Sequence, residues 1–285
     1  MPPTFLNADL HCHSVVSDGT LTPEELAPRA AANGVELWSL TDHDEIGGQH
    51  RAIAAAHAAG MAYLTGAEIS VTFAGVTVHI VGLGFDPDNA ALREGLAETR
   101  DGRIPRARDM ADQLAKVGIA GAYDGALKYV GNPQLVSRTH FARFLVETGV
   151  CRDTPEVFRK YLTEGKPGYV PHRWAALGDA VRWITQAGGV AVIAHPARYK
   201  LTANEEYALF SEFKTHGGQG VEVVTGSHTA AEYVTYADMA REFGLAASRG
   251  SDFHGPEESY TDLGKLPFLP DTLTPVWELL EHRIR

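Results

Sequence analysis

The chain has 285 residues, 44% of them hydrophobic and 21% charged, and this composition excludes a protein that is disordered over most of its length. Its 25 basic and 36 acidic residues give a formal net charge of −11, which argues against a protein that binds duplex DNA through a basic face. No apolar run reaches about 18 residues, and the N-terminus lacks a basic segment before an apolar one, so we expect no membrane span and no signal peptide.

The first third of the chain alternates short apolar runs with helical patterns. These runs predict strands at 5–10, 35–40 and 61–64. Thr22 is predicted to cap the first helix with Glu25 reaching back to it, and a second helix is predicted over roughly 48–59. Ala74 and Gly75 separate two further apolar runs, which predicts a hairpin.

The same alternation returns in the last third of the chain. Apolar runs predict strands at 190–194, 221–224 and 245–247. Thr229 is predicted to begin a helix that Gly244 ends. Strands that alternate with helices indicate an α/β protein with a parallel sheet and crossover helices, and about seven such strands favour a barrel over an open sheet.

The middle of the chain has little strand character. Short amphipathic helices are predicted at 106–117, 137–148 and 155–162. The segment also carries eight arginines, namely Arg100, Arg103, Arg106, Arg108, Arg138, Arg143, Arg152 and Arg159. We therefore expect a barrel built from residues 1–98 and 169–285, with residues 99–168 forming a helical insertion that covers the active site.

Histidines and carboxylates cluster where the predicted strands end. They are His11, His13, Asp18, Asp42, His43, Glu68, His79, His195, Asp252 and His254. The carboxyl ends of barrel strands converge on one face, and active sites are built there. Since His, Asp and Glu are ligands that suit zinc, manganese and iron, the set predicts a multinuclear metal site.

The spacing of the first two histidines also predicts which way the intervening cysteine faces. Alternation along a strand sends His11 and His13 to one side and Cys12 to the other, so we expect Cys12 to pack in the core. Asp252 and His254 have the same spacing. For Asp42 two interpretations stay open, a turn or cap residue and a partner of a metal ligand.

The motifs around these residues resemble those of the polymerase and histidinol phosphatase (PHP) superfamily. They are Asp-Leu-His-Cys-His-Ser from Asp9, Thr-Asp-His-Asp from Thr41, Gly-Ala-Glu-Ile from Gly66, His79, Ala-His-Pro from Ala194 and Ser-Asp-Phe-His from Ser251. They occur in the family's order and span about 1–95 and 170–285. The resemblance implies a distorted seven-stranded (β/α) barrel that holds three metal ions.

The resemblance also implies how the ligands are shared among the metals. His11, His13, Glu68 and Asp252 would hold the first metal, with Glu68 bridging to a second that His79 and His195 complete. Asp18, His43 and His254 would hold the third. The resemblance favours manganese in these positions, and zinc and iron are alternatives because His and carboxylate ligands accept all three.

Within the superfamily, the sequence resembles the bacterial RNase AM-type branch. The resemblance rests on the run from Leu10 to Gly19 and on Ser137-Arg138-Thr139-His140 in the insertion. It implies removal of the 3′-phosphate from 3′,5′-bisphosphonucleotides (pAp to AMP and phosphate) and trimming of short 5′-phosphorylated RNA from its 5′ end. We expect these small nucleotides and RNA ends as partners, without a membrane or duplex DNA, and leave the oligomeric state open. Two cysteines fit a reducing compartment, and we expect the cytoplasm.

The expected chemistry assigns roles to further residues. Closely spaced metals lower the pKa of a shared water for attack on phosphorus, so His11, His13, Glu68 and Asp252 are assigned catalytic roles. The substrate's other phosphate requires arginines, and the candidates are Arg138 and Arg198, then Arg103 and Arg106, with surface ion pairs as the alternative role for each. His228 is a candidate acid for the leaving group. His172 is the other candidate acid and is grouped with the substrate-binding residues.

Three other functions compete with this hypothesis. A histidinol phosphate phosphatase would share the metal ligands but would not require arginines from an insertion. An amidohydrolase barrel also begins with His-x-His, but it often bridges its metals with a carboxylated lysine, and no lysine lies at a predicted strand end. A catalytically silent metal-binding regulatory module is disfavoured because the ligand set is complete.

Overall fold

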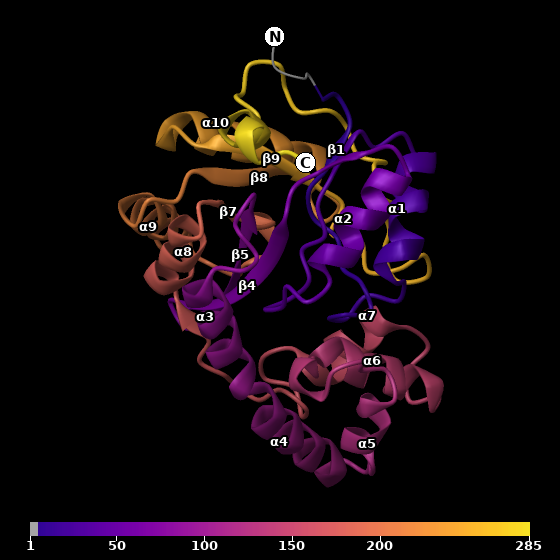
Figure 1. The fold of residues 1–285 in the computed structure, drawn as a ribbon. Coiled ribbons are helices and arrows are strands. Elements are labelled where there is room, and N and C mark those ends of the chain that lie inside the picture. Colours follow the sequence, from indigo (N-terminus) through magenta and orange to yellow (C-terminus); the bar gives the residue numbers. More distant parts are fainter. Residues whose placement is uncertain (1–4) are drawn as a thin grey trace.

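The computed structural model describes residues 5–285. Residues 1–4, which belong to the N-terminal segment in which we expect no signal peptide, lie outside the described part. Two sheets form the centre of this part of the chain (Figure 1). The smaller is parallel and contains β1 (Ala8–Asp9), β2 (Leu37–Trp38) and β3 (Ala62–Tyr63) in that order. The larger has the order β6-β4-β5-β7-β8-β9. Its strands are β4 (Gly66–Phe73), β5 (Val76–Leu83), β6 (Ala175–Ala176), β7 (Val190–Ile193), β8 (Gly220–Thr225) and β9 (Ala246–Gly250).

Hydrogen bonds join the two sheets at two places, which closes them into a ring. On one side Leu10 N donates to Arg249 O at 3.0 Å, which joins β1 to β9. On the other, Asp44 N donates to Glu68 O at 2.8 Å, which joins the chain after β2 to β4. This arrangement, with helices outside, confirms the predicted α/β class and is consistent with the predicted barrel.

The ring departs from seven parallel strands, because the described residues contain nine strands and one of them runs against its neighbours. Strand β5 is antiparallel to both β4 and β7. The predicted hairpin explains this, since Ala74 (φ 46°) and Gly75 (φ 79°) form a two-residue turn with positive φ at both positions. A turn of this length can join only antiparallel strands.

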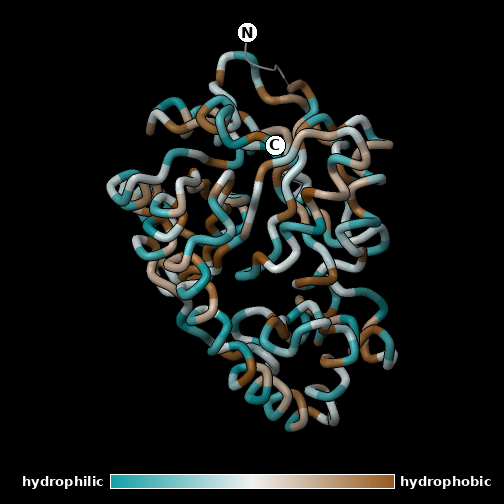
Figure 2. The backbone as a smooth tube through the Cα atoms, in the orientation of Figure 1, coloured by the Kyte–Doolittle hydropathy of each residue, from teal (hydrophilic) through white to brown (hydrophobic). Residues whose placement is uncertain are grey.

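Helices cover the outside of the ring. They are α1 (Pro23–Ala32), α2 (Gln49–Ala58), α3 (Ala90–Asp101), α8 (Leu177–Gln186), α9 (Ala203–Thr215) and α10 (Ala230–Phe243), and a 3-10 helix, Val276–Arg283, follows near the C-terminus. The predicted capping boxes are present, with Thr22 and Glu25 at α1 and Thr229 and Glu232 at α10. Hydrophobic and hydrophilic residues alternate along these helices (Figure 2), and their apolar faces bury the sheet.

A second group of helices lies between β5 and β6 in the sequence. It contains α4 (Arg103–Lys116), α5 (Ala122–Leu127), η1 (Pro133–Leu135), α6 (Arg138–Glu147), α7 (Thr154–Val157) and η2 (Phe158–Leu162). These helices share a core of their own, which includes Leu114, Phe141 and Leu145. They gather at one end of the molecule, at the bottom of Figure 1. The expected domain boundaries at 98/99 and 168/169 stay a prediction.

No helix among the described residues combines the length and the apolar character that a membrane crossing requires.

Candidate metal centre

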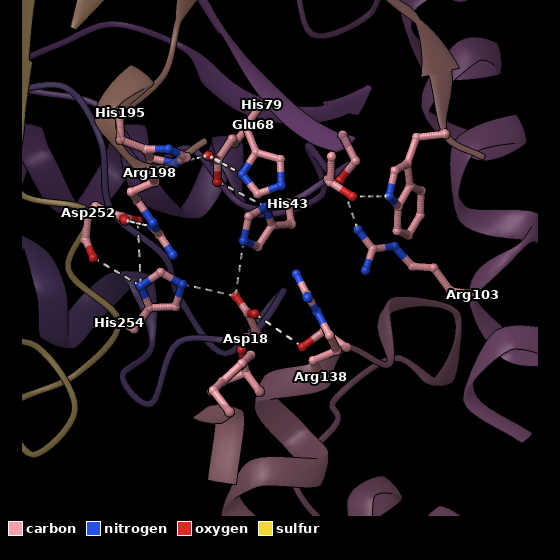
Figure 3. A pocket seen from close by; sticks show the side chains of 16 residues that line it. Asp18, His43, Glu68, His79, Arg103, Arg138, His195, Arg198, Asp252 and His254 are labelled. Carbon is pink, nitrogen blue, oxygen red and sulfur yellow. Dashed lines mark hydrogen bonds and ion pairs between the residues drawn. The ribbon is translucent and has the colours of Figure 1, made fainter. Parts of the chain in front are cut away.

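The predicted ligands converge at one end of the ring, as Figure 3 shows for those that line the cavity. His11 and His13 follow β1, Asp18 lies in the next loop, His43 follows β2, Glu68 lies in β4, His79 in β5, His195 after β7, and Asp252 and His254 after β9. Each strand is held by its neighbours through backbone hydrogen bonds, so it presents its ligand from a fixed position.

Glu68 lies at the centre of this group. Its Oε1 is 2.8 Å from His79 Nδ1 and 2.8 Å from His195 Nε2. Its Oε2 is 2.9 Å from His43 Nδ1, 3.2 Å from His13 Nε2 and 3.3 Å from the corresponding nitrogen of His11. A carboxylate in contact with five imidazoles is placed to bridge two cations.

Two further carboxylates extend the group. Asp252 Oδ1 is 3.3 Å from His13 Nε2 and 3.6 Å from His254 Nδ1. Asp18 Oδ1 is 3.5 Å from His254 Nε2 and 3.8 Å from His43 Nε2. The ligand atoms thus form a continuous patch that runs from Glu68 to Asp18.

Three overlapping sets within this patch have the spacing of a metal site. One is His11, His13, Glu68 and Asp252, the second is His13, Asp18, His43 and His254, and the third is His43, Glu68 and His79. The first two contain the ligands expected for the first and third metals. The third set has His43 where we expected His195, which nevertheless contacts the same oxygen of Glu68 as His79 does.

Several ligand atoms lack the partners that buried polar atoms normally have. His13 Nδ1, Asp18 Oδ1, His43 Nδ1, Glu68 Oε2 and His195 Nδ1 are buried without a hydrogen bond. His43 Nδ1 and Glu68 Oε2 approach to 2.9 Å without hydrogen-bond geometry. Unpaired buried polar atoms are costly, and cations placed among these lone pairs would satisfy them, so the residues present fit a divalent metal cluster.

The charge states of Glu68, His195 and His254 suit metals, whereas His13 holds a proton that a metal would have to displace. Burial raises the pKa of Glu68, but the neighbouring imidazoles outweigh burial and hold the pKa well below its ordinary value. Burial lowers the pKa of His195 and of His254 to about 4, so both rings are neutral at pH 7. Burial also lowers the pKa of His13, but hydrogen bonds to Asp252 and Glu68 outweigh it and raise this pKa to about 10. A proton on His13 thus supplies positive charge that the carboxylates attract.

Two ligands sit on backbone that L-residues rarely adopt. His195 has φ 25° and Asp252 has φ 55°, both in the positive region that favours glycine. Such conformations persist where the surrounding structure holds them, and they concentrate at functional sites. Here they turn two strand ends inward, so that both side chains face Glu68.

Glu222 supports the centre from behind, and the sequence analysis missed it. Its Oε1 accepts from His11 Nδ1 at 2.8 Å, and its Oε2 accepts from His195 N at 2.6 Å. The bond to Nδ1 leaves His11 Nε2 facing the ligand group. The sequence did offer a signal for Glu222, which is a charged residue inside the apolar run of β8. Buried carboxylates are rarely found without a specific partner, so such a residue indicates a supporting role.

Asp42 and Cys12 lie outside the ligand group. Asp42 accepts hydrogen bonds from Ser14 N, Ser14 Oγ and Ser17 Oγ at 2.6–2.8 Å. It therefore orders the loop that leads to Asp18, and these hydrogen bonds fit the turn interpretation, since neither serine is a predicted metal ligand. Cys12 points to the opposite side from the histidines and packs in the core, as the alternation predicts.

A cavity of about 110 Å³ lies in front of the ligands, and three of the four predicted substrate arginines line it. Arg103 comes from α4, Arg138 from α6 and Arg198 from η3 (Pro196–Arg198) (Figure 3). Trp174 and Phe158 also contribute to the wall. No lysine belongs to this wall in the described part of the chain, which removes the bridging residue that the amidohydrolase hypothesis requires.

The three arginines differ in their partners. Arg103 bonds to Asp44 and stacks over Trp174, with 4.8 Å from its Cζ to the ring. Arg198 Nη1 forms an ion pair with Asp252 Oδ2 at 2.6 Å. Within residues 5–285, Arg138 has no carboxylate partner, and its one hydrogen bond is a long contact of 3.5 Å to Leu162 O.

The structure does not bring three predicted residues to the cavity. Arg106 donates to Val170 O and stacks on Trp174. His172 packs edge-on against the same indole and lines a separate hollow. The His228 ring contacts Ala197 N and Val223 O and stacks on Tyr236, so the proposed acid has no free nitrogen facing the ligands. These positions correct the sequence analysis, which could not place side chains that depend on tertiary packing.

The helical segment contacts the metal loops through two side chains to which the sequence analysis assigned no role in the site. Ser137 Oγ donates to Asp18 Oδ2 at 3.1 Å. Arg143 donates to Asp18 O and forms a two-bonded ion pair with Glu258, at 2.7 and 2.8 Å. Glu258 follows His254 closely in the chain, so Arg143 links the loops of two ligands expected for the third metal.

Known proteins resemble the chain over its whole length. A family model for the PHP domain matches residues 9–97. A 3′,5′-nucleoside bisphosphate phosphatase from Chromobacterium violaceum is 52% identical over 278 residues, which cover 98% of each chain. A 5′-3′ exoribonuclease from Haemophilus influenzae is 42% identical over 270 residues, covering 95% of this chain and 97% of the relative.

Two solved structures also resemble the chain over nearly its whole length. One from Chromobacterium violaceum, described as an amidohydrolase with bound sulfate and no metal, superposes with a TM-score of 0.95 and 52% identity over 98% of this chain and 97% of that chain. A putative metal-dependent phosphoesterase from Bifidobacterium adolescentis gives a TM-score of 0.81 at 28% identity, over 99% and 98% of the two chains.

Proposed function

Because the chain belongs to the PHP domain family of its full-length relatives, we propose that it is a metal-dependent phosphoesterase that removes the 3′-phosphate of 3′,5′-bisphosphonucleotides. Relatives named for bisphosphate hydrolysis and for 5′-3′ exoribonuclease activity support this assignment. We propose small nucleotides, and short RNA with a 5′-phosphate, as its binding partners. The free, buried thiols of Cys12 and Cys151 support the cytoplasm as its location.

The cofactors proposed are three divalent metals, with manganese first. His11, His13, Glu68 and Asp252 would hold one, Glu68, His79 and His195 another, and Asp18, His43 and His254 the third. When bound, such ions lower the pKa of water and offset negative charge at phosphorus. The unpaired ligand atoms described above support the cluster.

The position of Arg138 is the observation that favours a substrate with two phosphates. It lies in the wall of the cavity that the ligands face, and it forms no ion pair with a carboxylate within residues 5–285. A guanidinium without a partner beside a phosphatase centre is suited to a second, non-reacting phosphate. We therefore assign the 5′-phosphate to Arg138. Histidinol phosphate has no such group.

The chain's other residues position and orient the substrate. Arg198, which Asp252 holds close to the centre, can bind an oxygen of the 3′-phosphate. Glu222 keeps His11 Nε2 aimed at the centre, and Ser137 holds Asp18. Trp174 and Phe158 close the cavity with apolar surface and reduce the access of water. Each contact fixes geometry before the reaction begins.

The direct test compares two substrates. The manganese-loaded protein is incubated with adenosine 3′,5′-bisphosphate and, in parallel, with histidinol phosphate, and released phosphate and nucleotide product are measured. We expect fast conversion of the bisphosphate to 5′-AMP and little turnover of histidinol phosphate. The reverse preference would contradict the proposal while retaining the metal centre.

Replacing Arg138 tests the assignment of the 5′-phosphate. Arg138→Ala is expected to raise KM for the bisphosphate about 10- to 100-fold, the size of one charged hydrogen bond, and to affect 3′-AMP far less. Arg108→Ala removes an arginine that stacks on Tyr123 within the helical segment, and it serves as the control. Equal changes for the two substrates would disprove the role of Arg138.

A further inference from the structure

The cavity at the metal centre continues into a second hollow that a mononucleotide substrate would not use. This hollow has a volume of about 260 Å³ and shares part of its wall with the cavity, including Phe158, Arg198 and His254. Its remaining wall comes mainly from the loops after β8 and β9, whereas α4 and Trp174 line only the first cavity. The two spaces therefore meet at the predicted ligands and extend toward different parts of the molecule.

The wall of the second hollow suits a nucleoside. Its hydroxyl groups come from Thr139, Thr154, Ser227, Ser251, Ser259 and Thr261. Its charged groups are already paired, Arg198 with Asp252 at 2.6 Å and Glu258 with Arg143 at 2.7 Å. A wall of neutral donors and acceptors matches the hydroxyls of ribose and the edges of bases better than it matches an isolated anion.

Tyr260 stands at the rim of this hollow with 95% of its surface exposed. A large aromatic side chain gains little from such exposure, and its flat face is open to a stacking partner. Nucleobases are such partners, and each base stacked on an aromatic ring contributes measurably to the binding of single-stranded nucleic acid.

The hollow also has a continuation. Thr154, Ser259 and Tyr260 belong at the same time to the wall of a wider groove of about 780 Å³. Arg159 lines this groove and has no ion-pair partner in the part of the chain that the structure describes. A continuous path thus leads from the ligands over Tyr260 to an unpaired cation on the surface.

We infer that this path binds RNA on the 3′ side of the cleaved bond, with Tyr260 stacking on the first base beyond that bond. The inference rests on the proposed function, in which the 5′-terminal nucleotide lies on the Arg138 side and the scissile phosphate at the ligands. Water adds to the phosphorus, and the bond from phosphorus to the 3′-oxygen of the first nucleotide breaks. That oxygen receives a proton from the water, and the phosphate stays on the next nucleotide as a new 5′-phosphate.

The test uses pAp and the trinucleotide pApApA with the manganese-loaded full chain. Tyr260→Ala is expected to lower kcat/KM for the trinucleotide about ten times more than kcat/KM for pAp, the size of one base stack. Tyr260→Phe keeps the ring and is expected to restore the wild-type ratio. Tyr207→Ala, which removes a half-exposed tyrosine on α9 away from the path, is the matched control. Equal losses on both substrates in Tyr260→Ala would overturn the inference.

A second variant blocks the path instead of weakening it. Ser227→Trp places a bulky side chain in the hollow, and we expect it to slow the trinucleotide selectively, with thermal melting and metal content confirming that the protein is folded and loaded. Undiminished trinucleotide turnover by this variant would also overturn the inference. A wild type that hydrolyses pAp but not pApApA would refute the path alone. A wild type that hydrolyses neither would refute the proposed function itself.

Discussion

The metal centre and the two arginines that face it from the helical segment, Arg103 and Arg138, are held in place by different kinds of contact. The ligands lie on or directly after strands whose backbones are bonded to their neighbours, and Glu222 adds support from β8. Arg103 and Arg138 instead come from α4 and α6, which pack in a separate core. Side-chain contacts such as Ser137 to Asp18 and Arg143 to Glu258 join these helices to the metal loops.

This difference separates the chemistry from the recognition of the substrate. A strand in a closed sheet does not move without disturbing its neighbours, so the ligand positions belong to the fold as a whole. A single polar side-chain contact contributes only about 1 kcal/mol. The recognition side can therefore be weakened one contact at a time while the barrel stays folded, and the expected effects below follow this order.

The largest effect is expected when the central carboxylate loses its charge. Glu68→Gln keeps the size of the side chain but removes the anion that five imidazoles contact. We expect bound metal to fall and turnover to drop about 1000-fold, since metals supply several kcal/mol of the catalysis. Elemental analysis and phosphate release measure both, and full metal content with full activity would show that Glu68 is not central.

A smaller loss is expected when the support behind the centre is removed. Glu222→Gln weakens the contacts to His11 and to the backbone of His195, and metal affinity should fall about 10- to 100-fold. Competition with a fluorescent chelator measures the affinity. Glu232→Gln, a capping residue on α10, is the control and should leave the affinity unchanged. A similar loss of metal affinity in both variants would show that the loss comes from lower stability of the fold and not from the contacts of Glu222.

The affinity for metal should also depend on pH. His13 has its pKa raised to about 10, so at neutral pH a metal must displace its proton. At pH values below the pKa of His13, the affinity for metal therefore increases with pH, by about tenfold per pH unit for one displaced proton. Calorimetry in two buffers of different ionisation enthalpy counts the released protons, and a titration without proton release would contradict the raised pKa.

The smallest effect should come from the recognition side. Arg143→Gln removes a link between the loops of Asp18 and His254, so we expect up to about tenfold weaker binding at the third metal position only. Metal titration should then show two sites of unchanged affinity and one weakened site. Arg108→Gln is the control. Weakening of all three sites would show that the helices support the whole centre.

Local sequence patterns selected the candidate ligands, which the structure brings together, because each pattern lies within a few residues of one strand. His11 and His13 share a strand face by alternation alone, and Asp252 and His254 repeat that spacing. The hairpin at Ala74 and Gly75 was equally local. However, we expected a parallel barrel and did not foresee that the second strand of this hairpin, β5, runs antiparallel within it.

Side chains whose surroundings come from distant segments could not be placed in this way. Nothing near His228 in the sequence shows that the backbone N–H of Ala197, 31 residues away, donates a hydrogen bond to its Nε2. Tertiary packing also determines the partners of Arg103 and Arg138. It places Arg103 beside a carboxylate and leaves Arg138 without one. Glu222 was the exception, since an acid inside an apolar strand was a signal that sequence alone offered.

The closure of β9 against β1 bears on protein synthesis. Six of the nine predicted ligands precede residue 80, but Asp252 and His254 come near the end of the chain. The hydrogen bond from Asp252 N to His11 O, at 2.8 Å, forms only after that last segment has left the ribosome. A nascent chain therefore carries most of the predicted ligands, but it cannot assemble the complete candidate centre until this last segment has been made.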